Sequence, residues 1–222
     1  MSKAAVEEQG SRLGGVSVTR LLVLGAVRIF QPAHGYLMRR ELLTWQVEDW
    51  ANLNPGSIYN ALRSLTRDGL LVEKEAEIAV GGVGPGARAA YTLTADGETE
   101  FFRLLREALW QLHPSQPSWL LAGLSFWWAL TRREVLDALE ARRSQLAARL
   151  ASTPYVVEEI RSSATPDHVV EHIHLFEMHL RAELDWVESV STRIADGAYG
   201  FAGEDRRRIF GALTPPEPDI QV

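Results

Sequence analysis

Apolar residues recur with helical spacing along most of the chain, and only one short region changes to the pattern of a strand. A broad apolar face predicts a first helix over 16–30, and a second, short helix is expected over 34–43. Asn54 and Pro55 begin a third helix, because asparagine caps free amides and proline at the first helical position loses no hydrogen bond. Gly69 is expected to end it.

The hydrophobic period changes after the third helix. Residues 71–75 and 89–93 have strand-like composition, and the glycine-rich run 81–86 lies between them, which predicts a β-hairpin with a flexible tip. Another helix follows, from about 98 to 112. Three helices, a hairpin and a fourth helix are the order of a winged helix-turn-helix domain, which we assign to residues 16–112.

The rest of the chain predicts a second, all-helical domain. Two prolines in 113–118 indicate a linker, and the helical domain is assigned to 119–196. Residues 1–15 are expected to be flexible, and the Gly- and Pro-rich tail 197–222 is expected to be mostly disordered. The predicted fold class is therefore mostly α with a small β-hairpin wing: a winged helix-turn-helix domain followed by an antiparallel helical hairpin.

Within the helical domain, the first helix is expected over 119–130, and Thr131 and Glu134 have the spacing of a capping box for the second. The last helix is expected from Thr165 to about 195. The seam of the second helix reads Leu136, Leu139, Arg143, Leu146, Leu150. A narrow hairpin buries little by itself, so we predict a homodimer. The expected interface residues are Leu136, Leu139, Leu146, Leu150, Ile173, Phe176, Leu180, Leu184 and Val187.

The third helix has the two faces that a recognition helix needs. Ile58, Ala61, Leu62 and Leu65 form an inner, apolar side. Short polar groups suit base edges, and arginines one turn apart suit phosphates or a guanine. The same pattern also fits an ordinary amphipathic helix. The outer side carries Asn54, Ser57, Tyr59, Asn60, Arg63, Ser64 and Arg67.

Several motifs closely resemble the PadR family of bacterial transcriptional regulators. They are His34-Gly35-Tyr36, Pro55-Gly56-Ser57-Ile58-Tyr59-Asn60-Ala61-Leu62, Leu65-Thr66-Arg67-Asp68-Gly69-Leu70-Leu71, and the wing sequence Gly84-Pro85-Gly86-Ala87-Arg88 with Tyr91-Thr92-Leu93-Thr94-Ala95-Asp96-Gly97. The C-terminal half is similar to the helical dimerisation domain of the longer members, so that the resemblance spans roughly 17–195.

The resemblance implies a homodimer that places two recognition helices in successive major grooves of an inverted-repeat operator. It implies repression of a nearby gene, and release from DNA by an effector, often a small aromatic molecule. The wing departs from the family pattern, because Ala87, Ala89 and Ala90 flank a single arginine; we expect a weaker contribution to DNA affinity from this wing. The DNA-facing residues carried over from the family are Tyr36, Asn54, Ser57, Tyr59, Asn60 and Arg63, with Arg88 on the wing.

Charge and composition agree with the interpretation of the chain as a DNA-binding regulator. The chain of 222 residues has a formal net charge of −6, but residues 17–72 carry six arginines against four acids. The absence of cysteine excludes disulfides, thiolate nucleophiles and sulfur-ligated zinc. No catalytic constellation is apparent, so we predict neither an enzyme nor a cofactor. The longest apolar stretch, 119–130, is too short to span a bilayer, and a cytoplasmic protein without membrane contact is expected.

Three other groups of residues allow alternatives. His168 and His172 are four residues apart and make a weak metal-binding candidate, which we rank below a pH effect of the histidines on dimerisation. The same pattern also fits ordinary helix residues that are solvated or paired with neighbouring glutamates. The tail arginines 206–208 either contact DNA or keep the tail soluble. Aromatic residues of the helical domain fill a core or line an effector site, and the candidates for the latter are Trp119, Phe126, Trp127, Trp128 and Trp186.

The sequence therefore predicts a PadR-like, ligand-responsive repressor that binds double-stranded DNA as a homodimer. The alternative is a winged-helix interaction module, or a small-molecule sensor, without an operator of its own. A preference for one DNA sequence and a steep dependence on salt would separate the two, because a protein-binding module should show neither.

Overall fold

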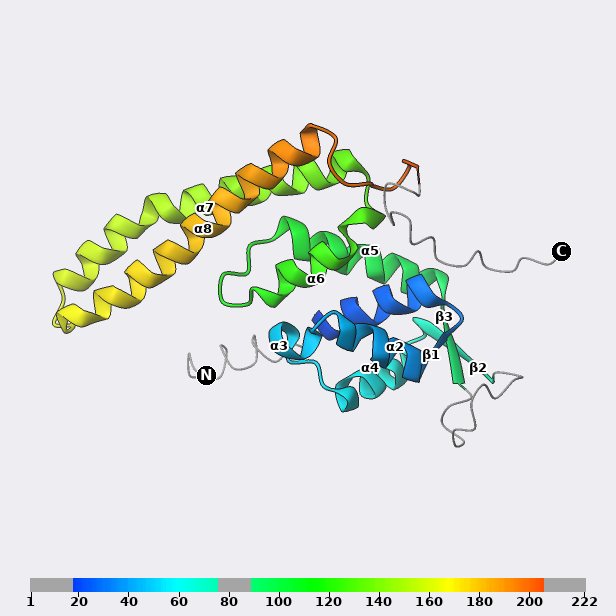
Figure 1. The fold of residues 1–222 in the computed structure, drawn as a ribbon. Coiled ribbons are helices and arrows are strands. Elements are labelled where there is room, and N and C mark those ends of the chain that lie inside the picture. The colour runs from blue at the N-terminus through cyan, green and yellow to red at the C-terminus, as the bar shows by residue number, and fades with distance from the viewer. Residues whose placement is uncertain (1–17, 76–88, 206–222) are drawn as a thin grey trace. The chain divides into compact units, whose positions relative to one another are not determined.

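The computed structural model describes residues 18–75 and 89–205 (Figure 1). Its contacts divide these residues into two compact units. The first unit contains 18–75, 89–108 and 115–126, and the second contains 109–114 and 127–205. The helix over 118–126 thus groups with the first unit, whereas the sequence suggested a boundary before it.

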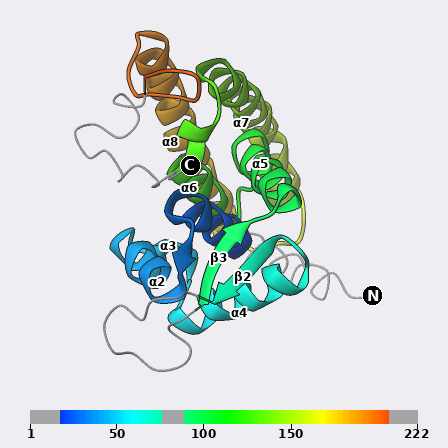
Figure 2. The same ribbon diagram turned by 90° about the vertical axis from the view of Figure 1, so that its right-hand side faces the viewer.

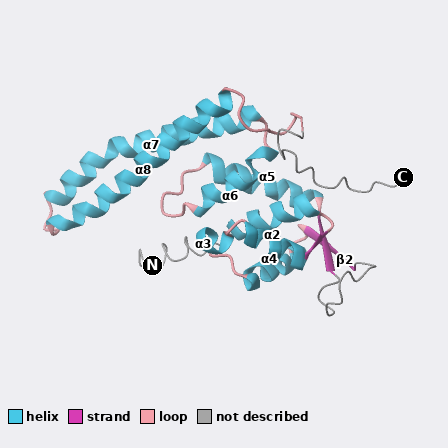
Figure 3. Ribbon diagram, viewed as in Figure 1, coloured by secondary structure: helices cyan, strands magenta, loops and turns pink. Residues whose placement is uncertain are grey.

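The first unit has the predicted winged-helix order of elements, and the predicted fold class is confirmed (Figure 3). A helix over the described residues 18–30 precedes the labelled elements. The third predicted helix begins and ends where the sequence indicates. The elements are β1 (Ala33–His34), α2 (Gly35–Thr44), α3 (Val47–Ala51), α4 (Pro55–Arg67), β2 (Leu71–Glu75), β3 (Ala89–Leu93), α5 (Ala95–Trp110) and α6 (Ser118–Phe126).

The sheet of the winged-helix unit contains one strand more than the predicted hairpin. β2 and β3 pair antiparallel, with Glu73 opposite Tyr91, and the two-residue strand β1 adds to the other side of β3. Figure 2 shows the strands beside α4. The added strand ties the start of α2 to the base of the wing, because His34 pairs with Ala90.

Two glycines of the first unit mark places where elements approach closely. A Cβ on Gly25 would lie 2.3 Å from the ring of Phe126, which is fully buried and also packs edge-on against Phe101. A Cβ on Gly97, in the first turn of α5, would lie 2.0 Å from the backbone oxygen of Leu70. The missing side chains therefore let α6 and α5 pack into the core.

The second unit is built on two long antiparallel helices, α7 (Arg132–Arg161) and α8 (Val170–Ala195), which lie side by side in Figure 1. The predicted capping box is present: Thr131 accepts a hydrogen bond from the backbone of Glu134, whose carboxylate accepts one from the backbone of Thr131. The predicted helix over 119–130 is shorter, since α6 ends at Phe126 and a 3₁₀ turn, η2 (Trp127–Ala129), follows. Another turn, η3 (Asp167–Val169), precedes α8.

The face that α7 buries within one chain includes Leu139 and Leu146 of the predicted seam, but not Leu136, Arg143 or Leu150. Arg142 is buried, whereas Arg143, which the seam included, is half-exposed and pairs with Glu140 on the same helix. Leu139 and Leu146 lie on the buried face as expected. A three-four spacing alone does not distinguish neighbouring arginines on a helix, so the burial of Arg142 within one chain was not predicted.

Residues 197–205, which we call the C-terminal strap, are ordered and packed on the second unit. Phe201 is fully buried, its ring lies 5.9 Å from the Trp127 ring, and the guanidinium of Arg132 lies over it. Arg132 also donates to the backbone oxygens of Ala198 and Tyr199 and forms an ion pair with Glu204 at 2.8 Å. The expectation of disorder from residue 197 is therefore wrong for 197–205, and 206–222 lie outside the described residues.

Candidate nucleic-acid interface

The local sequence of α4 sets both of its ends. The side chain of Asn54 accepts a hydrogen bond from the backbone of Ser57 at 2.9 Å, and Pro55 occupies the first turn. Gly69 adopts a positive φ of 75°, and the backbone of Leu70 donates to the oxygen of Leu65. These caps give the helix a defined start and stop within a strongly amphipathic segment.

The outer face of α4 is exposed and basic. The inner residues are buried, while Tyr59 is 39% exposed and Asn60, Arg63 and Arg67 are exposed. The helix contains two arginines and no acidic residue. We call this face the α4 outer face, and it consists of Ser57, Tyr59, Asn60, Arg63 and Arg67.

Hydrogen bonds within the outer face pre-arrange its polar groups. Arg63 donates to the side-chain oxygen of Asn60 at 2.6 Å, and Arg67 donates to Ser64 at 3.2 Å. At the end of the helix Asp68 accepts from Arg20 at 2.8 Å, and this hydrogen bond lowers the pKa of the Asp68 carboxyl. The Asp68 carboxylate thus pairs mainly with Arg20, and Nε of Arg67 lies 3.7 Å from its other oxygen.

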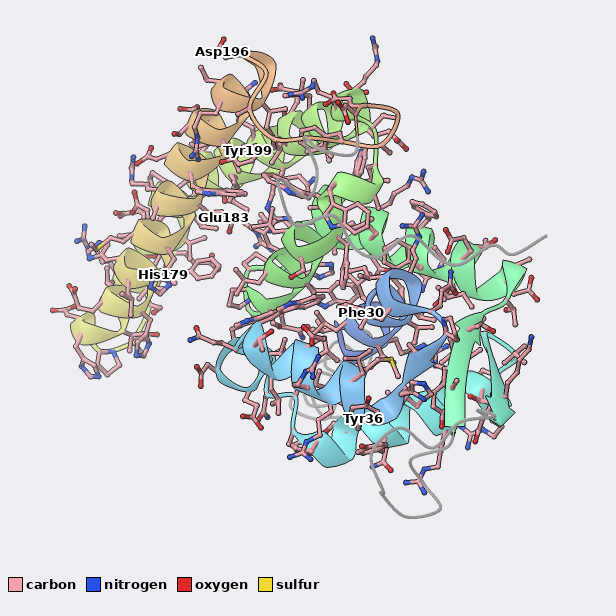
Figure 4. The ribbon with its side chains drawn as sticks, turned by 45° about the vertical axis from the view of Figure 1, so that its right-hand side comes forward. Phe30, Tyr36, His179, Glu183, Asp196 and Tyr199 are labelled. Carbon is pink, nitrogen blue, oxygen red and sulfur yellow. The ribbon has the colours of Figure 1, made fainter. Side chains whose placement is uncertain are left out.

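The start of α2 contributes a second part of this surface. A Cβ on Gly35 would lie 2.9 Å from the ring of Tyr59. The absence of a side chain at Gly35 therefore leaves room for the Tyr59 ring of α4. Tyr36, labelled in Figure 4, is 48% exposed. Its ring stacks on that of His34, with ring centroids 6.0 Å apart. The His-Gly-Tyr motif therefore brings Tyr36 and Tyr59, both predicted to face DNA, to one side of the winged-helix unit.

An acidic residue that the sequence analysis did not single out lies next to this surface. Glu73 stands opposite Tyr91 in the strand register. Burial, and then the charge of Glu73, raise the pKa of the Tyr91 hydroxyl, while the nearby Arg63 lowers it. Strand alternation does not specify which residues of β2 and β3 lie opposite each other, so only the fold places Glu73 beside Tyr91 and brings Arg63 of α4 near them.

Wing residue Arg88 and the glycine-rich run 81–86 lie outside the described residues, as do the tail arginines 206–208. Asn54 is placed at the helix start as predicted, and its side-chain oxygen is engaged in the cap. Of the predicted DNA-facing residues, Arg67 of the α4 outer face included, the structure thus describes all but Arg88.

The five aromatic effector candidates fall into two groups. Trp119 and Phe126 are buried in the first unit, and Phe126 packs on Gly25, so the structure gives both a packing role. Trp127, Trp128 and Trp186 are part-buried in the second unit, where Trp127 contacts the strap. A surface hollow of about 360 Å³ in this unit is lined by none of them; its residues are Leu112, Gln145, Ala148, Arg149 and Ser152.

The predicted dimer-interface residues are divided between buried and part-exposed positions. Leu139, Leu146, Leu180 and Val187 are buried within one chain, where α7 packs on α8. Their apolar surface is therefore already used by the hairpin itself. The part-exposed members are Leu136, Leu150, Ile173, Phe176 and Leu184.

The described residues bring together no group of three or more histidine and acidic side chains of the kind that holds a metal ion. His168 lies in η3 and His172 in α8, and both are exposed. Over the same described residues, no helix combines the length and the apolar composition needed to cross a membrane.

Comparison with known proteins places the winged-helix part of the chain. Residues 23–103, more than a third of the chain, match the family model described as the Transcriptional regulator PadR-like family. The winged-helix segment is PadR-like. The match confirms the resemblance over these residues, and a family of transcriptional regulators agrees with the prediction of a non-enzyme. No curated protein matches the chain.

Solved structures similar to this chain include Bacillus subtilis PadR in complex with operator DNA, at 21% identity and a TM-score of 0.36, covering 79% of this chain and 98% of that one. Bacillus subtilis PadR with p-coumaric acid gives 17% identity and a TM-score of 0.32, covering 80% and 97%. A PadR-like regulator from Bacillus cereus gives 15% and 0.31, covering 80% and 98%. Because these TM-scores are below 0.5, the family match is the comparison that carries weight.

Proposed function

We propose that this PadR-like protein is a repressor that binds an inverted-repeat operator as a homodimer and releases it on binding an effector. The observation that carries the DNA-binding part is the α4 outer face. Arg63 and Asn60 are exposed and are joined by a 2.6 Å hydrogen bond. Both lie on a helix whose inner face is buried. Such a pair offers a guanidinium and an amide to base edges or phosphates in a major groove.

The DNA experiment measures fluorescence anisotropy of the full chain on DNA from upstream of its own gene. We expect binding that resists an unrelated competitor duplex and weakens steeply with salt. Arg63→Ala should weaken it by roughly tenfold or more, about 1–3 kcal/mol. Arg181→Ala is the matched control, since Arg181 is an exposed arginine of α8 paired with Glu177.

If the protein does not bind the upstream DNA specifically, binding sequences are selected from a pool of random DNA. If that selection also returns no sequence motif, the repressor is excluded and the interaction module is favoured. If Arg88→Ala has a larger effect than Arg63→Ala, the wing and not α4 dominates binding.

Dimerisation is proposed through the part-exposed apolar residues of the hairpin. Ile173, Phe176 and Leu184 lie on α8 and keep surface that the α7 contact does not cover. Phe176→Glu should turn the dimer into a monomer in analytical ultracentrifugation, because a charge in an apolar interface is costly. Met178→Glu, at an exposed position of the same helix, is the matched control and should leave the mass unchanged.

The effector part of the proposal rests on the resemblance to the PadR family. Trp127, Trp128 and Trp186 are the aromatic candidates that keep some exposure. A small aromatic effector should quench tryptophan emission and release the operator at the same concentration. If no aromatic compound in a panel quenches tryptophan emission or releases the operator, the effector part of the proposal is excluded. The DNA-binding part is unaffected by that result.

A further inference from the structure

Among the described residues, Arg142 is the one charged side chain that is buried, with 2% exposure. It lies on the inner face of α7 and donates through Nε to a carboxylate oxygen of Glu183 on α8, which Figure 4 labels. Its Nη1 donates to the backbone oxygen of Gln111 at 2.8 Å and reaches that of Leu109 at 3.5 Å. One guanidinium thus joins both long helices to the end of α5.

Gln145, one turn further along α7, continues this contact. Its Nε2 donates to the backbone oxygen of Trp110 at 2.8 Å, and its Oε1 accepts from the backbone N–H of Leu112 at 3.1 Å. Each of the four consecutive residues 109–112 is therefore bonded to a side chain of α7 through its backbone. We call Arg142, Gln145 and Glu183 the α5 clamp.

The α5 clamp satisfies groups that the helix itself leaves open. The last carbonyls of an α-helix have no partner within the helix, and they carry the negative end of the helix dipole. A buried guanidinium and an amide are suited to both demands. Burying an ion pair is costly, however, and an apolar contact of similar volume commonly stabilises a fold equally well. Unlike an apolar contact, the directed hydrogen bonds of the α5 clamp fix the direction of the backbone over residues 109–112.

The direction of this segment matters because of where α5 begins. The helix starts at Ala95, directly after β3 of the winged-helix unit, and its end at Trp110 belongs to the second unit. It is thus the first of the segments through which the chain passes between the two units; the chain returns to the first unit over 115–126 and enters the second again at Trp127. In a dimer, the direction in which α5 leaves each hairpin bears on the separation of the two recognition helices.

We propose that the α5 clamp is a positioning group that determines which half-site spacing the dimer accepts on DNA. Arg142 and Gln145 contact no DNA in this assignment; they act through the end of α5. The inference rests on the proposed function, since it requires a dimer that reads two half-sites. It concerns the choice between operators, which is separate from the affinity that the α4 outer face provides.

The test uses the full chain and a set of duplexes with identical half-sites whose spacer is changed one base pair at a time. The wild type should prefer one spacing by roughly tenfold or more, because the helical repeat rotates a displaced half-site away. Arg142→Lys keeps the charge and loses the directed guanidinium donors. Gln145→Ala removes both of its hydrogen bonds to the backbone of Trp110 and Leu112 without leaving a buried charge. Both variants should reduce the preference to roughly twofold while binding to the best spacing changes little.

Controls separate positioning from general damage to the fold. Arg143→Lys, next to Arg142 but half-exposed and paired with Glu140, should keep the wild-type preference. Circular dichroism and sedimentation identify variants that are unfolded or monomeric, and if Arg142→Lys is one of them, Gln145→Ala decides alone. A folded, dimeric Gln145→Ala protein with the wild-type spacing preference overturns the inference. A wild type that binds no sequence specifically overturns the proposed function instead, and the inference with it.

Discussion

The two units hold their helices in place by different means. In the winged-helix unit, glycines without a Cβ allow close packing: Gly25 lies against the Phe126 ring, and Gly97 lies against the backbone of Leu70. The helical unit uses arginines that bind backbone oxygens, Arg132 at the strap and Arg142 at the end of α5. Steric fit tolerates no added volume, whereas directed hydrogen bonds fix the path of a chain that apolar contacts alone would leave free.

The largest effect should come from the strap. Phe201→Ala removes a fully buried ring that packs on Trp127 and lies under the guanidinium of Arg132. We expect the free energy of unfolding to fall by about 3–5 kcal/mol in chemical denaturation. Tyr155→Ala, in the same unit but 79% exposed, should change it by less than about 0.5 kcal/mol. Equal effects of the two would mean that the strap adds nothing to the helical unit.

Gly97→Ala tests steric fit in the winged-helix unit. The added methyl group would meet the backbone oxygen of Leu70 at 2.0 Å, and a backbone cannot move aside as a flexible side chain can. We expect a loss of about 1–3 kcal/mol in the free energy of unfolding. The neighbouring Asp96 is exposed in the same helical turn, and Asp96→Ala should cost less than about 1 kcal/mol. A neutral Gly97→Ala would show that this approach is looser than the structure has it.

The difference between the units also explains what the sequence could predict. Local signals identified the Asn54 cap and the Thr131 capping box, because each depends on residues a few positions apart. The two strands of the hairpin were identified one at a time, each from its own composition. The five-residue helix α3 and the two-residue strand β1 are too short to produce a period. Neither gave a signal that sequence patterns can detect.

The missed features of the helical unit have a different origin. The strap is ordered through Arg132, a residue 72 positions away from its partner Glu204, and composition alone indicated disorder. The choice of Arg142 over Arg143 depends on the position of α5, which no spacing within α7 reveals. In the candidate site, the outer residues of α4 were predictable from amphipathicity, whereas Glu73 came near them only through the sheet register.

A smaller effect is expected for Gly35→Ala, which asks whether steric fit also shapes the DNA-binding face. The new methyl group would displace the Tyr59 ring, 2.9 Å away. We expect operator affinity to fall by about 1–2 kcal/mol in anisotropy titrations. The double variant Gly35→Ala, Tyr59→Ala should bind no worse than Tyr59→Ala alone, since the ring that the methyl displaces is then absent. Additive losses would show that Gly35 acts independently of Tyr59.

Asn54 gives the smallest and most selective test, because it was predicted both to cap α4 and to face DNA. Asn54→Ala removes the acceptor for the Ser57 amide, so we expect about 1 kcal/mol less stability and weaker operator binding. Asn54→Ser keeps an acceptor at the cap and should change the free energy of unfolding by only a few tenths of a kcal/mol. If Asn54→Ser restores operator affinity together with stability, the asparagine serves DNA binding through the helix start. If stability returns and affinity does not, its amide contacts the DNA itself.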